Sequence, residues 1–155
     1  MGRFFRLRAL REEVGQSLVE LALLLPILVF GLIGGADLAR AFALQLAVQN
    51  GARAGAESYA IDFTPTPAEA IARTLDEMGR TPGFEIDPVT GKVKAIVTVT
   101  VAEADGATAC ISPPTVAEPC FVTVNVQYTF RTLVPWPIVP NVANFNRETT
   151  MRTFY

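Results

Sequence analysis

One stretch of this chain restricts its possible folds more than any other: an almost purely apolar run over residues 18–36. The run reads LVELALLLPILVFGLIGGA, nineteen residues whose only charged side chain is Glu20. As an α-helix rising about 1.5 Å per residue, it would extend roughly 28 Å, close to the hydrocarbon thickness of a bilayer. A core helix of a soluble domain would keep a polar face, and this run has none after Glu20. The sequence therefore predicts one membrane-spanning helix, which we place at residues 16–36.

The charges that flank the run predict its orientation. Four arginines precede it: Arg3, Arg6, Arg8 and Arg11. The first charged residues after it, Asp37 and Arg40, nearly cancel. The positive-inside rule then puts residues 1–15 in the cytoplasm as a leader and residues 37–155 outside as an external domain. A cleaved secretory signal is the alternative, but the run is long for such a signal and no clear A-x-A site closes it.

The composition excludes most enzyme chemistry. The 155 residues include no histidine and two cysteines, and the net charge is −2. Serine triads and HExxH zinc sites need imidazole, and two thiolates cannot complete a four-thiolate zinc site. We therefore expect no catalytic residue, no cofactor, no metal and no nucleic-acid partner. An exported hydrolase would need a pair of acids at a suitable spacing. The candidate acids of the external domain show no such spacing: Asp62, Asp76, Glu77, Glu85, Asp87, Glu103 and Asp105.

A short motif at the start of the apolar run is the most specific signal in the chain. Gly15 is followed by Gln16-Ser17-Leu18-Val19 and then by Glu20. This arrangement resembles the processing site of type IV prepilins. The longer stretch GQSLVELALLLPILVFGLIGGADLARAF, followed by AVQNGARAGAESYA, resembles TadE-like pseudopilins of tight-adherence (Tad/Flp) pilus systems. The resemblance covers residues 15–60 and includes Pro26 and the pair Asp37 and Arg40.

The resemblance implies a minor pilin that takes part in assembly of a type IVb-like pilus. It implies that a prepilin peptidase cuts after Gly15, that Gln16 becomes the new N-terminus, and that Glu20 becomes the fifth residue and pairs subunits. The implied partners are this peptidase, other pilins or pseudopilins, the inner-membrane pilus machinery and membrane lipid. The implied location is the bacterial inner membrane, crossed once, or the pilus itself.

The cost of Glu20 supports the same processing step on physical grounds. A charged group at the centre of a spanning helix costs on the order of 2.5–3.5 kcal/mol, and Glu20, near the boundary, should cost less. Cleavage before Gln16 would create an amine that can reach this carboxylate in its own chain or in a neighbour. The alternative is that Glu20 snorkels to the cytoplasmic interface.

Residues 37–59 are expected to continue the helix with one apolar side to bury. Leu38, Phe42 and Leu46 form its apolar stripe. The polar stripe contains Asp37, Gln45, Gln49, Arg53 and Glu57. Within the apolar run, Gly31 and Gly35 have the GxxxG spacing that permits close helix approach, although such a pair is weak evidence by itself.

The rest of the external domain is expected to be a second helix and a small sheet. Thr66, Pro67 and Glu69 form a capping box, which starts a helix over residues 67–78. Alternating apolar residues then predict strands at 92–101 and 121–133, with a further strand at 147–155. Three strands that are apolar on one side form an antiparallel sheet, which the helices cover. The expected class is α+β with a pilin-like layout.

Cys110 and Cys120 lie between the first two expected strands, in the segment CISPPTVAEPC. On the exported side of a membrane we expect a disulfide, which would contribute on the order of 2.5–3 kcal/mol in the chain-entropy model. A pair of free thiols is the alternative. A catalytic thiol is not expected, because the chain has no histidine to activate it.

Two kinds of function therefore remain for comparison. The favoured one is a minor pilin or pseudopilin, with Gly15 and Gln16 as the processing site and Glu20 as the assembly residue. The alternative is a single-span, membrane-anchored binding module that is not processed. In that case Glu20 could be replaced by leucine without loss of function.

Overall fold

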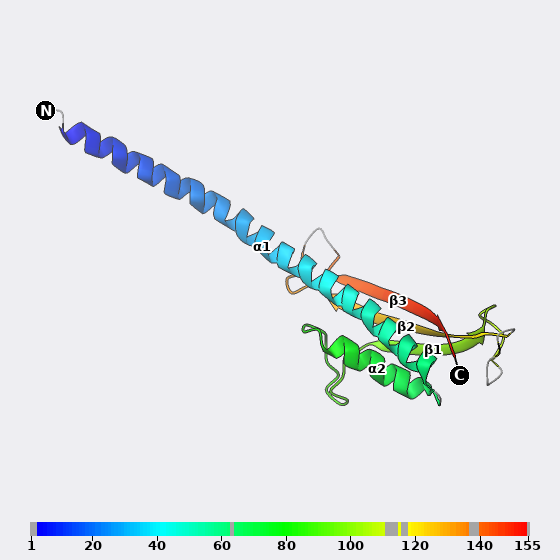
Figure 1. Ribbon diagram of the computed structural model, residues 1–155. Coiled ribbons are helices and arrows are strands. Elements are labelled where there is room, and N and C mark those ends of the chain that lie inside the picture. The colour runs from blue at the N-terminus through cyan, green and yellow to red at the C-terminus, as the bar shows by residue number, and fades with distance from the viewer. Residues whose placement is uncertain (1–2, 63, 111–114, 116–117, 137–139, 155) are drawn as a thin grey trace. The chain divides into compact units, whose positions relative to one another are not determined.

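The computed structural model describes residues 3–62, 64–110, 115, 118–136 and 140–154, with side chains described from residue 15 onward. It contains helices α1 (Arg3–Ile61) and α2 (Pro67–Gly79). The strands are β1 (Ile96–Glu103), β2 (Cys120–Arg131) and β3 (Val142–Arg152). The chain divides into two compact units, Met1–Ala39 and Arg40–Tyr155, and α1 contributes residues to both (Figure 1).

The α+β class is confirmed, with the expected long N-terminal helix, short second helix and three-stranded antiparallel sheet. The strand order is β1-β2-β3, and β2 is the central strand. Its register pairs Thr100 with Thr123 in β1–β2, and Thr123 with Thr150 in β2–β3. The backbone of α1 is helical from Arg3, so the segment expected as a leader belongs to the same helix as the apolar run. The side chains of its four arginines lie outside the described residues.

The strand boundaries that differ most from the sequence prediction are the starts of β1 and β3. β1 begins at Ile96 and not at residue 92, because the preceding residues pair with an earlier segment: Val93 forms an antiparallel bridge with Ile86, and the amide of Lys94 donates to the carbonyl of Glu85. β3 begins at Val142, five residues before the expected start. Among the first residues of β3, only Phe145 faces inward. One inward residue does not make an alternating apolar pattern, so the sequence does not indicate this early start. The expected last residue, Tyr155, lies outside the described residues.

The start of α2 has the predicted capping box. The hydroxyl of Thr66 accepts a hydrogen bond from the amide of Glu69 at 3.3 Å and donates one to Glu69 Oε2 at 2.6 Å. Pro67 occupies the first helical position, where its missing amide hydrogen costs nothing. These local interactions are sufficient to fix where the helix begins.

The core of the second unit lies between the helices and the inner face of the sheet. Leu44, Val48 and Ala52 of α1 are at most 1% exposed and belong to one cluster with the inward residues of β2. Those β2 residues are Val122, Val124, Val126, Tyr128 and Phe130. At the edge of this core, the guanidinium of Arg40 lies 5.2 Å from the ring centroid of Phe130. Such a contact combines burial with a cation–π attraction.

The predicted buried stripe of α1 was wrong. Leu38, Phe42 and Leu46 are 60%, 65% and 59% exposed, whereas the buried stripe is made mainly of small residues. It consists of Leu44, Ala47, Val48, Gly51, Ala52, Gly55, Ala56 and Ala60. The physical reason is space, because small side chains let the backbone of α1 approach α2 and the sheet closely.

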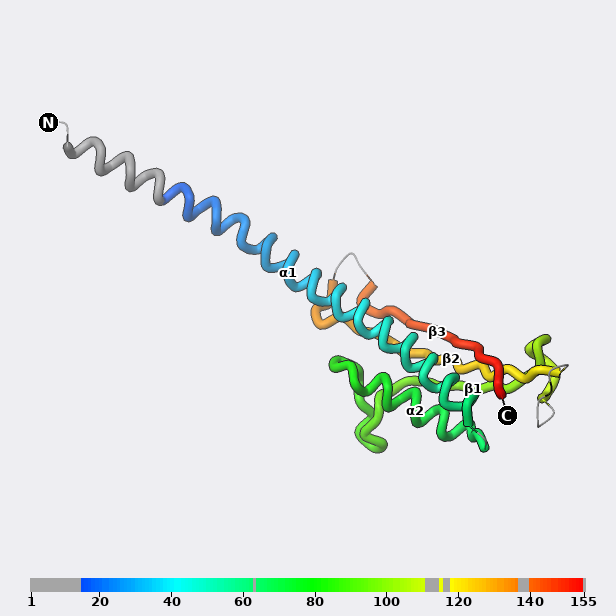
Figure 2. The backbone as a smooth tube through the Cα atoms, viewed as in Figure 1, coloured from blue at the N-terminus to red at the C-terminus, as the bar shows by residue number. Residues whose placement is uncertain are grey.

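Two glycines of α1 mark that close approach to α2, which runs beside α1 in the second unit (Figure 2). A Cβ atom added at Gly51 would lie 2.6 Å from Met78 Cγ. A Cβ added at Gly55 would overlap the hydroxyl of Thr74 and lie 3.0 Å from the carbonyl oxygen of Ala70. The glycine pair with GxxxG spacing that packs closely in this unit is therefore Gly51 and Gly55. At Gly31 and Gly35, by contrast, an added Cβ would meet no atom within 4 Å.

Candidate functional site

The motif around Gly15 lies on α1, where the helical repeat brings residues 16 and 20 onto one side. The amide Nε2 of Gln16 donates a hydrogen bond to Glu20 Oε1 at 3.1 Å, and both side chains are exposed. Gly15 precedes them in the same helix, and a Cβ atom added there would meet nothing within 4 Å. The structure therefore brings Gln16 and Glu20 into direct contact, with Gly15 exposed in the same helix.

The surroundings of this motif are apolar and exposed. Large aliphatic and aromatic side chains from Leu18 to Leu32 are 45–76% exposed, with Val29 the least and Leu32 the most exposed. Exposed apolar surface of this extent is unfavourable in water and requires lipid or other apolar helices to cover it. Among the described residues, one helix is long and apolar enough to cross a membrane, over Gly15–Ile61, and its most apolar window has no buried residue.

The hydrogen bond to Glu20 shows what residue 16 can do chemically. Its donor is a neutral amide, which offsets part of the desolvation of the carboxylate but none of its charge. A cationic donor in the same place would form a charge-assisted hydrogen bond, which is about twice as strong. A positive group at residue 16 would therefore bind the Glu20 carboxylate more strongly than the neutral amide of Gln16 does.

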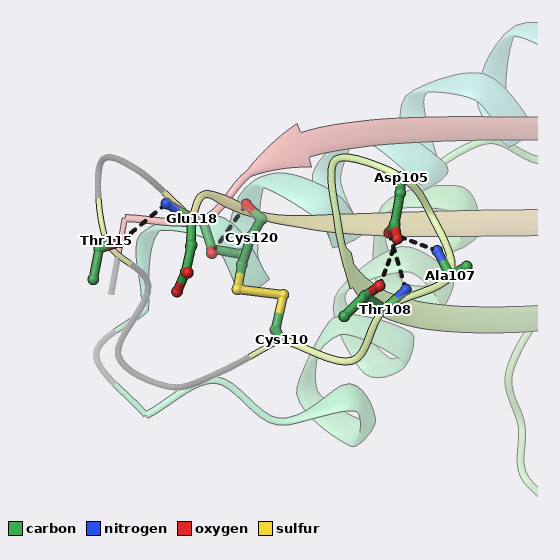
Figure 3. The surroundings of a disulfide bond; sticks show 8 residues. Asp105, Ala107, Thr108, Cys110, Thr115, Glu118 and Cys120 are labelled. Carbon is green, nitrogen blue, oxygen red and sulfur yellow. Dashed lines mark hydrogen bonds between the residues drawn. A yellow bond between two sulfur atoms is a disulfide. The ribbon is translucent and has the colours of Figure 1, made fainter.

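In the connection between β1 and β2, Cys110 and Cys120 form a disulfide with a Cα–Cα distance of 5.7 Å (Figure 3). Cys120 is the first residue of β2, and its carbonyl oxygen accepts the amide of Thr153 at 2.9 Å. The cross-link thus attaches the loop after β1 to the end of the sheet. Residues 111–114, 116 and 117 of the closed loop lie outside the described residues.

A turn next to the disulfide is organised by Asp105, as Figure 3 shows. Its carboxylate accepts hydrogen bonds from the hydroxyl of Thr108 and from two backbone amides. These amides belong to Thr108, at 2.9 Å, and Ala107, at 3.0 Å. These bonds favour the ionised form and lower the pKa of Asp105 to about 2, with the Thr108 hydroxyl as the largest cause. The Asp105 carboxylate is therefore a structural acceptor and not a proton donor at neutral pH.

Two other groups with shifted pKa values form an exposed ion pair. Lys94 Nζ lies 2.8 Å from Glu85 Oε1, and this hydrogen bond lowers the pKa of Glu85 and raises the pKa of Lys94. No group of three or more histidine, cysteine or acidic residues in the described parts of the chain is arranged to hold a metal ion. The candidate functional site is therefore the motif of Gly15, Gln16 and Glu20, which places a hydrogen-bonded carboxylate among exposed apolar side chains.

Sequence reasoning missed the packing role of Gly51 and Gly55. The signal was present, since GARAG repeats the GxxxG spacing within an alanine-rich helix. Attention to hydrophobicity favoured Gly31 and Gly35, which lie in the more apolar segment. Glycine and alanine contribute little to a hydrophobic stripe, so the closest packing surface of α1 was the least visible one.

Comparison with known families agrees with the position of this motif. The model for TadE-like proteins matches residues 15–57, from Gly15 to Glu57, and the resemblance noted in the sequence is confirmed over that range. The match covers the apolar run and the part of α1 with the paired glycines. It leaves α2 and the sheet outside. No curated protein and no solved structure matches the chain.

Proposed function

We propose, from the TadE-like match, that this chain is a minor pilin or pseudopilin that takes part in assembly of a Tad-type pilus after removal of its leader. The match indicates a Tad pilus-associated protein, and the TadE-like family is not an enzyme family. The observation that carries the finer proposal is the position of Glu20, five residues after Gly15, at the start of an exposed apolar helix. The family match begins at the same glycine.

The proposed topology follows from the distribution of apolar surface and charge. Residues 1–15 form a cytoplasmic leader, residues 16–36 cross the inner membrane, and residues 37–155 lie outside the cytoplasm. The exposed apolar side chains of residues 18–32 support the crossing. The arginines of the leader support the orientation. The Cys110–Cys120 disulfide is in keeping with an oxidising compartment on the outer side.

The proposed role of Glu20 begins with cleavage by a prepilin peptidase between Gly15 and Gln16. Cleavage makes the backbone nitrogen of Gln16 an amine, which is positively charged at neutral pH. Residue 16 is already within reach of Glu20, since its side chain makes a 3.1 Å hydrogen bond with the carboxylate. The new amine can bind Glu20 of its own chain or of a neighbouring pilin. Either pairing lowers the cost of a carboxylate in lipid, and the pairing with a neighbouring chain also favours lateral association of helices.

The proposal names three kinds of partner. The peptidase acts once, at Gly15, and other pilins or pseudopilins then cover the apolar helix. The inner-membrane machinery of the pilus moves the processed subunit. Membrane lipid covers the same surface before assembly, because that surface has no buried residue within the chain.

A set of Glu20 variants in the native pilus system tests this role. Glu20→Leu and Glu20→Gln should both reduce the number of pili seen by electron microscopy, because neither can form an ion pair with the amine. Glu57→Gln is the matched control: it removes an exposed acid from the same helix and should leave pili unchanged. Normal pilus numbers with Glu20→Leu would refute the assembly role and favour the unprocessed, membrane-anchored module.

A further inference from the structure

Strand β1 is shorter than β2, and among the described residues this leaves one end of β2 with no neighbouring strand on that side. The β1–β2 ladder begins at Ile96, which pairs with Gln127. The last four residues of β2, from Tyr128 to Arg131, pair with β3 alone. A pocket of about 860 Å³ lies beside this open stretch and is lined by β2, by β3 and by the chain that leads into β1. The sheet therefore has both an open edge and space next to it.

The hydrogen bonds of the sheet determine where the backbone groups of this stretch point. In an antiparallel sheet, the amide and carbonyl of one residue point to the same neighbouring strand, and those of the next residue point to the strand on the other side. Thr132 and Cys120, at the two ends of β2, both bond to residues that adjoin β3, so the even-numbered residues of β2 face that strand. The amide and carbonyl groups of Thr129 and Arg131 therefore point to the open side.

The chain before β1 bends away and does not cover this edge. If β1 continued in register, Lys94 would face Thr129 and Lys92 would face Arg131. The backbone groups of these lysines are already used elsewhere, because the amide of Lys94 donates to the carbonyl of Glu85 at 2.9 Å and the carbonyl of Lys92 accepts an amide of the same segment at 2.8 Å. In the described part of the chain, no strand therefore meets the backbone groups of Thr129 and Arg131. Such groups form a template for an extended segment.

Charged side chains line the pocket, and all but one of them are already held by other groups. The carboxylate of Glu85 lies 2.8 Å from Lys94 Nζ, and that of Asp87 accepts two backbone amides of its own turn at 2.8 and 2.9 Å. Arg131 makes no ion pair within the described residues, and its side chain is exposed on the outer face of the sheet, as is that of Thr129. Residues directly opposite each other in an antiparallel pair point to the same face, so an acid opposite Arg131 in an added strand is within its reach.

We propose that the open edge of β2 binds an extended segment of a partner protein, which adds as a strand antiparallel to β2 and places an acidic side chain opposite Arg131. The segment lies in line with β1 and exchanges backbone hydrogen bonds with Thr129 and Arg131. Its carboxylate forms a charge-assisted hydrogen bond with the guanidinium of Arg131. The backbone bonds supply affinity with little sequence preference, and the acid supplies the specificity. The inference concerns the second unit alone and does not depend on leader cleavage.

Titration of the full chain in dodecylphosphocholine micelles with a designed peptide, followed by amide NMR, tests the proposal. The probe is acetyl-Glu-Val-Thr-Val-amide, whose glutamate lies opposite Arg131 and whose threonine lies opposite Thr129 in the proposed register. Saturable shifts should be largest at the amides of these two protein residues. Arg131→Gln should weaken binding about two- to fivefold, as expected for loss of an exposed ion pair. Arg152→Gln is the matched control and should leave binding unchanged, because Arg152 is an exposed arginine at the other end of the sheet, opposite Phe121.

Two N-methylated forms of the peptide separate strand addition from binding through side chains. Methylation of the threonine nitrogen blocks an amide that faces β2 and should weaken binding by about tenfold or more. Methylation of the first valine nitrogen blocks an amide that faces away from β2 and should leave binding unchanged.

Three results would overturn the proposal. The first is the absence of saturable shifts at Thr129 and Arg131, and the second is equal behaviour of the two methylated peptides or of Arg131→Gln and Arg152→Gln. The third is a shift of the Thr129 and Arg131 signals with protein concentration alone, which would show that a second copy of the chain covers this edge. Amide spectra of both variants that match the parent away from the substituted residue establish that the variants are folded.

Discussion

The close approach of α1 to α2 predicts that one added methyl group at Gly55 destabilises the external unit. Alanine is normally favoured over glycine within a helix by about 1 kcal/mol. Here the new Cβ would overlap the buried hydroxyl of Thr74 and lie 3.0 Å from the backbone oxygen of Ala70. The backbone oxygen cannot rotate away, so the helices must separate.

The size of the effect follows from these opposing contributions. Overpacking a well-filled site costs about 1–3 kcal/mol. Movement of Thr74 also disturbs its 2.8 Å hydrogen bond to the carbonyl of Ala70, which adds about 1 kcal/mol. After the helix-propensity gain is subtracted, Gly55→Ala should lower the free energy of unfolding by about 1–3 kcal/mol. For a unit of this size, the melting temperature should fall by roughly 4–12 °C.

Thermal unfolding of the full chain in micelles, followed by circular dichroism, measures this change. Gly79→Ala is the matched control, because Gly79 also lies in a helix and an added Cβ there meets no atom within 4 Å. It should be neutral or slightly stabilising. Combining Gly55→Ala with Thr74→Ala removes the overlapping hydroxyl, so the double variant should lose less stability than the sum of the single changes. If Gly55→Ala is as stable as Gly79→Ala, the close packing of α1 on α2 described above is incorrect.

Three other predictions concern local features of the same unit. Replacing Cys110 and Cys120 together by serine should lower the free energy of unfolding by about 2.5–3 kcal/mol in urea titrations, and an unchanged midpoint would show that the cross-link does not constrain the unfolded chain. The Asp105 carboxyl should titrate with a pKa of about 2 by carbon NMR, below its usual 3.8. Because the folded-state pKa is lowered, its contribution to stability is present above about pH 4 and is lost as the pH falls through 2; a midpoint near 3.8 would exclude the Asp105 turn. Thr66→Ala should cost about 1 kcal/mol by loss of the α2 cap, whereas Thr98→Ala, at an exposed strand position, should cost less; equal effects would argue against the cap.

Features that depend on local sequence could be predicted well. The capping box of Thr66 and Glu69 fixes the start of α2 through contacts within four residues. The alternation from Val122 to Phe130 gives β2 its inner face, because a strand turns every second side chain to the same side. The i, i+4 spacing of Gln16 and Glu20 places them in contact on any helix.

Features that depend on tertiary space could not be predicted in the same way. Phe42 and Leu46 are more hydrophobic than Gly51 and Gly55, yet the glycines are buried. The choice depends on how closely α2 can approach, which the composition of α1 alone does not determine. Likewise, β3 begins early because β2 offers it a long pairing edge, from Phe121 to Arg131. The open stretch of β2 depends in turn on where the chain before β1 bends away, so no single segment predicts it.

The most direct test of the account is the intact mass of the protein purified from its native membrane. The account predicts a chain that lacks residues 1–15 and begins at Gln16, with conversion blocked when Gly15 is replaced by leucine. A native protein that retains Met1, in cells whose prepilin peptidase processes its other substrates, would contradict it.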